Sequence, residues 1–290
     1  MLTPLIEQLQ NNSSFFYTVI IFLGLCVGSF LNVVIYRLPI MLEKEWTQQC
    51  HEFLEHDIAT DNTEKFNLSY PASSCPQCNH KIRFWENIPV ISYLLLRGKC
   101  SNCKTHISFQ YPLIEIITAI LSVVVAYHFA ATLQTLAALL LTWSLIALSL
   151  IDAKKQILPD NITQPLLWLG IIVNLSALFT PTVSSIIGAI AGYLILWSIY
   201  HLFKLLTGKE GMGYGDFKLL AVLGAWMGWE MLPLIIVLSS VVGAVIGIIM
   251  VVFKKHDKSI PIPFGPYLAI AGWIAFLWGP QINQAWLGGS

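Results

Sequence analysis

The chain has 290 residues, of which 56% are hydrophobic and only 11% are charged. Soluble proteins carry about 25% charged residues on average, so this composition excludes an ordinary soluble domain and indicates a protein that crosses a membrane several times. The formal net charge is zero. Nucleic-acid-binding proteins carry basic patches to neutralise phosphates, and nothing in the overall charge suggests such a partner.

The placement of positive charge is more informative than its total. All sixteen Lys and Arg residues cluster in four patches, namely Arg37 to Lys104, Lys154 and Lys155, Lys204 to Lys218, and Lys254 to Lys258. Between the patches lie apolar stretches, and a spanning helix needs roughly 20 such residues. We count eight spans, at about 15–36, 112–131, 133–151, 162–180, 184–206, 214–230, 232–253 and 263–280.

With eight spans, every basic patch falls on the same side of the membrane. The positive-inside rule identifies that side as the cytoplasm, which leaves both termini outside. The sequence therefore predicts an all-α polytopic membrane protein. We expect two neighbouring helices within 112–151, because about 40 apolar residues in one helix would overshoot any bilayer.

The first span carries small and polar residues on one side, at Gly28, Ser29 and Asn32. Direct contact with a substrate is one interpretation, but we favour a face that packs on a neighbouring helix, with Asn32 hydrogen bonded between helices. We expect Pro39 to end this helix. The acidic segment that follows contains Met41–Leu54, which we interpret as a solvated surface helix.

Residues 40–111 form the only sizeable soluble segment, which we place in the cytoplasm. It contains two CxxC pairs, Cys75/Cys78 and Cys100/Cys103, separated by 21 residues. This spacing is typical of a structural zinc site in which four thiolates close a tetrahedron. Redox-active dithiols are the alternative. A catalytic zinc is disfavoured, because four protein ligands leave no open coordination position.

Two aspartates occupy matching places, each where an apolar run meets a charged loop. Asp152 closes the third span, where its charge opposes the helix dipole, and Asp216 follows a glycine-rich loop at the start of the sixth span. An N-terminal helix charge is an alternative reading of Asp216 taken alone. Because carboxylates at a membrane boundary usually have a function, we predict that Asp152 and Asp216 form the catalytic pair of an intramembrane aspartic protease.

Three other features receive structural interpretations. Glu115 begins the second span and is a third carboxylate that could reach the site, but we favour an interfacial residue in the first helical turn. Asp160, or Asn161 after it, is expected to cap the fourth span. We interpret the proline-rich segment 261–266 as a simple entry to the eighth span.

Several segments together resemble a known family. They are GSFLNVVIYRLP at 28–39, the two CxxC pairs, ENIPVISYLLLRGKC at 86–100, YPLIE at 111–115, Asp152, and GYGD at 213–216. The combination is similar to the type IV prepilin peptidases, bacterial inner-membrane enzymes with a GxGD aspartic protease motif. The resemblance covers about 28–267. From the spans and the cysteine pairs we divide the chain into a first span at 1–39, a cytoplasmic zinc domain at 40–111 and a seven-span protease core at 112–290.

The resemblance also implies two activities. The family cleaves a short basic leader from prepilins and pseudopilins at the cytoplasmic membrane face, and then methylates the new N-terminus with S-adenosylmethionine. No glycine fingerprint of a Rossmann methyltransferase is present, so no motif places the methyl donor, and we expect its site in the loop 40–111, with Glu43, Glu45 and Trp46 as candidates. The alternative function is a polytopic transporter or membrane scaffold whose carboxylates relay protons or cations.

Overall fold

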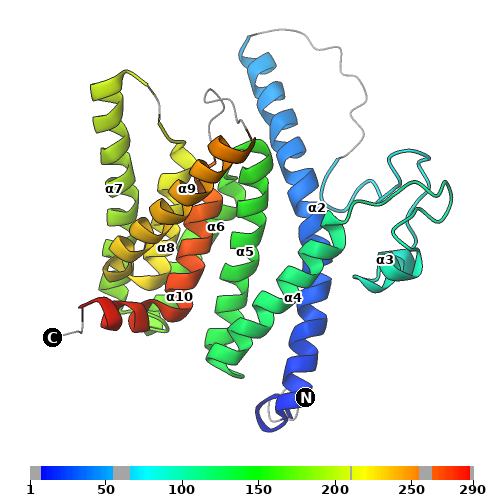
Figure 1. Cartoon of the computed structure of the whole chain (residues 1–290), viewed down its shortest axis with the longest axis horizontal. Coiled ribbons are helices and arrows are strands. Elements are labelled where there is room, and N and C mark those ends of the chain that lie inside the picture. Colours follow the sequence, from blue (N-terminus) through cyan, green and yellow to red (C-terminus); the bar gives the residue numbers. More distant parts are fainter. Residues whose placement is uncertain (1–7, 55–65, 210, 255–262, 288–290) are drawn as a thin grey trace. The chain divides into compact units, whose positions relative to one another are not determined.

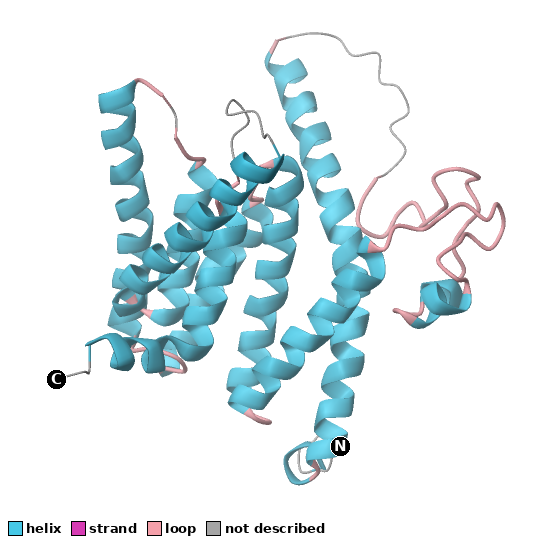
Figure 2. Ribbon diagram, in the orientation of Figure 1, coloured by secondary structure: helices cyan, strands magenta, loops and turns pink. Residues whose placement is uncertain are grey.

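In the computed structural model, described for residues 8–54, 66–209, 211–254 and 263–287, the regular secondary structure is helical (Figures 1 and 2). Two isolated β-bridges, Ser74 to Lys81 and Lys99 to His106, are the exceptions among these residues. The all-α class predicted from the sequence is therefore confirmed. The chain divides into two compact units, 1–135 and 136–290, which are described separately below.

The first unit is built on two long helices, α2 (Ser13–Phe53) and α4 (Gln110–Phe129). Between them the chain forms a short 3-10 helix, Phe84–Asn87, and α3 (Ile91–Leu95). Glycines let the long helices touch, since a Cβ at Gly28 would lie 2.7 Å from the Cα of Glu115. Asn32 donates a hydrogen bond of 3.1 Å to the carbonyl of Tyr111. The predicted small-residue packing face is confirmed.

Helix α2 does not end at Pro39, so that prediction is wrong. It has 41 residues with Pro39 inside it, which makes it about 60 Å long at 1.5 Å per residue, roughly twice the hydrocarbon thickness. The proline removes one backbone hydrogen bond, but the residues that follow, from Met41 to Glu45, are good helix formers. The expected surface helix at 41–54 is therefore the continuation of α2, and its residues 43–50 are exposed.

The second unit contains most of α5 (Leu133–Lys155) and the remaining helices. These are α6 (Asp160–Val173), α7 (Thr182–Thr207), α8 (Tyr214–Met227), α9 (Leu232–Lys254) and α10 (Gly265–Leu287), with short 3-10 turns at Asn174–Ser176 and Trp229–Met231. Helices α4 and α5 are separate, as expected for 112–151. Each of the eight expected spans has a helix, and their bounds differ from those expected by several residues at some ends.

Five helices are long and apolar enough to cross a membrane, judged by length and composition among the described residues. They include α2, α4, α5 and α7, and the fifth covers Trp229–Ile246. Helices α6 and α8 have 14 residues each, which corresponds to only about 21 Å. The count of eight spans therefore stays a prediction.

Helix α8 forms the core of the second unit, where it packs against α6, α7 and α10. The side chains of Phe217, Leu220 and Trp226 are fully buried. Helix α7 approaches it through Gly188 and Gly192, spaced as in the GxxxG motif of membrane helices. A Cβ at Gly188 would lie 2.3 Å from the carbonyl oxygen of Gly224. The backbones of α7 and α8 are therefore in direct contact here, which fixes the position of α8 relative to α7.

Candidate active site and metal site

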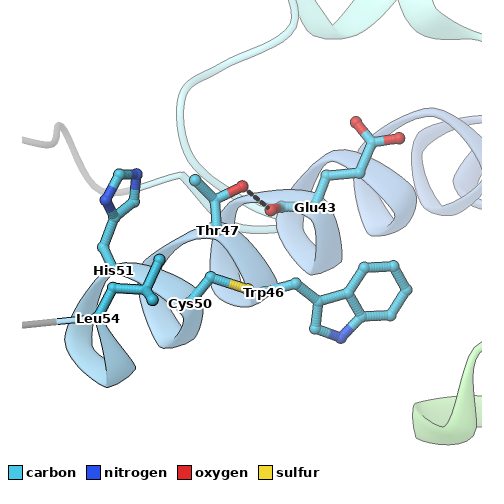
Figure 3. Close-up of a pocket in the computed structure, with 6 residues that line it drawn as sticks. All are labelled: Glu43, Trp46, Thr47, Cys50, His51 and Leu54. Atoms are coloured by element: carbon cyan, nitrogen blue, oxygen red, sulfur yellow. Dashed lines mark hydrogen bonds between the residues drawn. The ribbon is translucent and has the colours of Figure 1, made fainter.

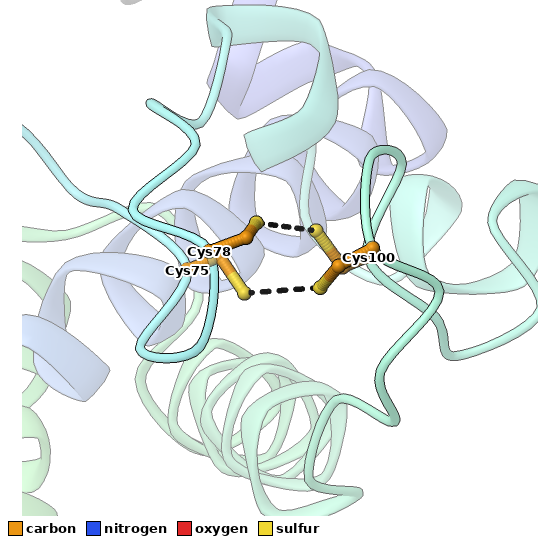
Figure 4. A group of neighbouring side chains, drawn as sticks. Cys75, Cys78 and Cys100 are labelled. Atoms are coloured by element: carbon orange, nitrogen blue, oxygen red, sulfur yellow. Dashed lines mark hydrogen bonds between the residues drawn. The ribbon is translucent and has the colours of Figure 1, made fainter.

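The four cysteines of the two CxxC pairs come together in the first unit (Figure 4). Their sulfur atoms all lie within 4.8 Å of one another, with 3.7 Å between Cys75 and Cys103 and 4.0 Å between Cys78 and Cys100. A tetrahedral zinc ion with Zn–S bonds of about 2.3 Å requires sulfur atoms roughly 3.8 Å apart. The cysteine cluster therefore fits a zinc ion.

Each CxxC pair is folded into the same small knuckle. The N–H of Asn79 donates to the carbonyl of Cys75, and the N–H of Lys104 donates to the carbonyl of Cys100, at 2.9 and 3.1 Å. Asn79 and Lys104 both have positive φ, 54° and 61°. Two copies of the same turn therefore direct their sulfur atoms toward a common centre. A chance grouping of cysteines would not be expected to repeat the turn.

The protonation state of Cys103 also favours a metal ligand. Hydrogen bonds from the Thr105 hydroxyl and the Thr105 backbone N–H lower the pKa of the Cys103 thiol to about 6. A metal is bound by the thiolate form of cysteine. The pKa of Cys75 is raised in the same cluster, so the lowered pKa favours the thiolate form at Cys103 in particular.

Asp152 and Asp216 both lie in the second unit, and both are buried, with 6% of their surface exposed. Asp152 is in the last turn of α5, and Asp216 is in the first turn of α8, where its N–H donates to the carbonyl of Gly213 at 3.2 Å. They are close enough for the charge of Asp152 to act on Asp216. Two buried carboxylates that interact in this way are equipped to share a proton.

A third element contributes a group that the sequence analysis missed. The N–H of Gly265, at the start of α10, donates a hydrogen bond of 3.1 Å to Oδ2 of Asp152. A Cβ at this position would lie 2.6 Å from the same oxygen, so glycine is required for the approach. The interpretation of 261–266 as a simple entry to the last helix is thus incomplete; residues 255–262 lie outside the described residues. A glycine between Phe264 and Pro266 was the only local signal.

The connection between α5 and α6 also reaches this site. A Cβ at Gly215 would lie 2.8 Å from the Cβ of Leu158, and a Cβ at Gly265 would lie 3.3 Å from Cδ1 of Leu158. The Leu158 side chain therefore lies against two glycines. One precedes Asp216 in the chain, and the other is the hydrogen-bond donor to Asp152.

Asp160 is structural, as expected, but it is not the cap of α6. The helix begins at Asp160 itself, with Pro159 at the N-cap position. Both carboxylate oxygens of Asp160 contact Nζ of Lys218 on α8, at 2.7 and 2.8 Å. The prediction placed the cap one residue too late, because an extended proline can fill the N-cap position without a side-chain bond.

Glu115 is engaged within the first unit. Its Oε2 accepts a hydrogen bond of 2.8 Å from the N–H of Val90, and its carboxylate also bonds the side chain of Ser29. Val90 has a positive φ of 60°, which is rare for a β-branched residue. Glu115 therefore anchors the segment before α3 to the packed pair α2 and α4, a structural role of the general kind that the sequence analysis preferred.

A hollow of about 450 Å³ lies beside the C-terminal part of α2 (Figure 3). The side chains that line it follow one face of the helix and are Glu43, Trp46, Thr47, Cys50, His51 and Leu54. Nδ1 of His51 is buried without a hydrogen-bond partner among the described residues. Glu43 and Trp46 are two of the three residues that the sequence suggested for the methyl-donor site.

Comparison with known proteins gives a consistent result along the whole chain. The model of the bacterial peptidase A24 N-terminal domain matches residues 22–129, and that of the type IV leader peptidase family matches residues 139–248. No solved structure matches the chain.

Three curated relatives, each named prepilin leader peptidase/N-methyltransferase, illustrate the similarity. The protein of Stutzerimonas stutzeri is 57% identical over 99% of this chain and 98% of its own length. That of Pseudomonas aeruginosa is 56% identical over 98% of each chain, and that of Neisseria gonorrhoeae is 50% identical over 91% of each chain. With both family models matched and such identity over nearly its full length, the chain belongs to the type IV leader peptidase family.

Proposed function

We propose that this protein cleaves the leader peptides of type IV prepilins and pseudopilins and then methylates the new N-terminus, with Asp152 and Asp216 as the catalytic pair of the protease. Family membership supports the two activities. The observation that carries the residue assignment is the meeting of two buried, interacting aspartates from the ends of α5 and α8. The transporter alternative is set aside, because the family is established.

The chemistry follows from sharing one proton between two carboxylates. Like charges a few ångströms apart cannot both ionise, so one group is ionised and the other is protonated. The ionised carboxylate activates a water molecule for attack on the scissile carbonyl, and the protonated one donates to the developing oxyanion. The pair titrates as a unit, so no single residue is assigned the proton.

The Gly265 N–H has a defined part in this mechanism. Its hydrogen bond to Oδ2 of Asp152 fixes the rotation of that carboxylate. The position of the other oxygen, Oδ1, is then fixed as well. In an aspartic dyad both carboxyl groups must be oriented toward the same water molecule. Holding Asp152 in a fixed orientation therefore lowers the cost of reaching the reactive geometry.

We assign the zinc ion to Cys75, Cys78, Cys100 and Cys103. A bound zinc would cross-link the two knuckles of a segment that has little regular structure of its own. Small metal domains of this kind take much of their folding free energy from the metal. The assigned role is structural, because four cysteine ligands fill the tetrahedron.

We assign the methyl donor, S-adenosylmethionine, to the hollow beside α2. Its volume of about 450 Å³ lies in the range of small-molecule pockets. A sulfonium cation is favoured by a nearby carboxylate and an aromatic ring, and Glu43 and Trp46 provide both. Nδ1 of His51, which has no hydrogen-bond partner among the described residues, is a polar atom beside this hollow. When bound, the donor supplies the methyl group for the amine that cleavage exposes.

The membrane arrangement that accompanies this function has eight spans in the bacterial inner membrane. Both termini face the periplasm, and the cysteine cluster and the aspartates face the cytoplasm. The distribution of Lys and Arg supports this orientation. The basic leader of the substrate would remain in the cytoplasm while its apolar helix lies in the bilayer, so a site at the cytoplasmic ends of helices would meet the scissile bond.

The experiment that tests the catalytic assignment uses purified full-length protein and a prepilin substrate with a basic leader. Asp152→Asn and Asp216→Asn preserve side-chain size but remove the ability to share a proton. We expect each to abolish cleavage, with expression and thermal stability unchanged. Substantial cleavage by either variant would refute the dyad.

A further inference from the structure

The connection between α5 and α6 contacts α5, α8 and the start of α10 around the aspartate site. It leaves α5 just after Asp152, and the N–H of Gln156 returns to the carbonyl of Asp152 at 2.8 Å. Leu158 then lies against Gly215 and Gly265, as described above. The connection ends at Asp160, which is bound to Lys218 of α8. We call residues 156–160 the strap.

We propose that the strap is a positioning device that sets how closely Asp152 and Asp216 approach each other. The inference rests on the proposed catalytic role of the two aspartates. In this scheme the strap residues are positioning residues, because they act on the aspartates through Gly215, Gly265 and Lys218. Leu158 acts as a wedge, and the ion pair between Asp160 and Lys218 holds the wedge in place.

Leu158 fills the space beside two glycines. The three atoms that would lie nearest a Cβ at Gly215 all belong to Leu158, at 2.8, 3.1 and 3.3 Å. The side chain of Leu158 therefore fills the space beside Gly215 and reaches Gly265 with its Cδ1. Because α8 and α10 both rest on one side chain, a change in its size would move the group that follows Gly215 or the donor to Asp152.

The ion pair between Asp160 and Lys218 joins the end of the strap to α8. Nζ of Lys218 lies 2.7 and 2.8 Å from the two oxygens of Asp160, so the ammonium is held by both. The side chains are 29% and 56% exposed, and such a pair contributes little to overall stability. Its effect is local: it ties the end of the strap to α8 two residues after Asp216.

The first test breaks the ion pair in three ways. We expect Asp160→Asn and Lys218→Met each to lower kcat for leader cleavage about tenfold with little change in KM, because misplacement of catalytic groups by 1 Å can cost roughly 100-fold. The double variant should be no slower than either single variant, and Lys218→Arg should retain most activity. Lys209→Met removes an exposed lysine from the loop before α8 as the matched control and should behave as wild type.

The second test changes the wedge. Leu158→Ala should lower kcat about tenfold or more, whereas Leu158→Met, which conserves side-chain volume, should stay near wild type. Methylation of an already processed pilin reports on the rest of the protein, and we expect it to remain unchanged in all these variants. A positioning role predicts this split between the two activities.

Wild-type kcat in Lys218→Met and Leu158→Ala would overturn the proposal, and so would a double variant whose loss is the product of the two single losses. An equal fall in cleavage and in methylation of processed pilin would also overturn it, because general damage to the fold would then explain the result. The catalytic assignment is tested separately by Asp152→Asn. If that variant is inactive while the strap variants are normal, the strap alone fails.

Discussion

Gly265→Ala tests whether the donor to Asp152 matters for catalysis. An added Cβ would lie 2.6 Å from Oδ2 and 3.0 Å from Cγ of Asp152. Non-bonded heavy atoms rest at roughly 3.5 Å, so the carboxylate or the start of α10 must move by about 0.9 Å. A shift of this size in a catalytic group costs up to about 100-fold in rate. We therefore expect kcat for leader cleavage to fall roughly 10- to 100-fold, or about 1.4 to 2.7 kcal/mol.

The matched control for this variant is Gly279→Ala, in the same helix. A Cβ there would lie 2.9 Å from Sδ of Met231, and its next neighbours are 3.8 and 3.9 Å away. Methionine is flexible and can move aside, so cleavage by Gly279→Ala should remain within about twofold of wild type. The assay is steady-state cleavage of a prepilin by purified protein of verified thermal stability. Wild-type kcat in Gly265→Ala would refute the reasoning that the Gly265 contact orients Asp152.

Three further predictions concern the first unit. Metal analysis should find about one zinc per chain, and the double variant Cys75→Ser/Cys100→Ser should lose it and become sensitive to proteolysis between α2 and α4; unchanged zinc content would contradict the assignment. Glu115→Gln should keep the hydrogen bond from Val90 and retain cleavage within about threefold, whereas Glu115→Ala should destabilise the unit by about 1 to 3 kcal/mol, measured by thermal unfolding. Inactive but stable Glu115→Gln protein would instead make Glu115 a catalytic candidate. Trp46→Ala should lower methylation of processed pilin at least tenfold more than cleavage, and Asp152→Asn should still methylate processed pilin; loss of cleavage alone in Trp46→Ala would contradict the methyl-donor site.

Most of the fold was predictable because membrane helices are specified by local composition. A run of about 20 apolar residues has few alternatives to a helix in lipid, and the structure has a helix in each expected span. The cysteine cluster was equally accessible, since two CxxC pairs separated by 21 residues are typical of a four-cysteine zinc site. The proximity of Asp152 and Asp216 was expected, because each lies next to a loop that carries lysine. The positive-inside rule places such loops on the same side of the membrane.

The course of α2 beyond Pro39 shows where local rules fail. A proline is unfavourable inside a helix by about 3 kcal/mol, so the sequence predicted that the helix would end at Pro39. The helix continues because Pro39 is buried in the packed first unit and is followed by strong helix formers. Burial and the helix formers that follow Pro39 offset the penalty for one missing hydrogen bond, and a rule based on the proline alone does not include these contributions.

The contacts that surround the aspartates were not predictable, for a different reason. Gly265 is 113 positions away from Asp152 in the chain, and Leu158 is an apolar residue in a short connection with no chemical signature. Their importance arises only when α5, α8 and α10 are brought together. Sequence patterns single out the two aspartates, because carboxylates are costly near a membrane. The groups that hold them in place are ordinary residues, and only the distances between them single them out. A small change at such a position, such as the single methyl group that Gly265→Ala adds, is therefore expected to be more harmful than its chemistry alone would suggest.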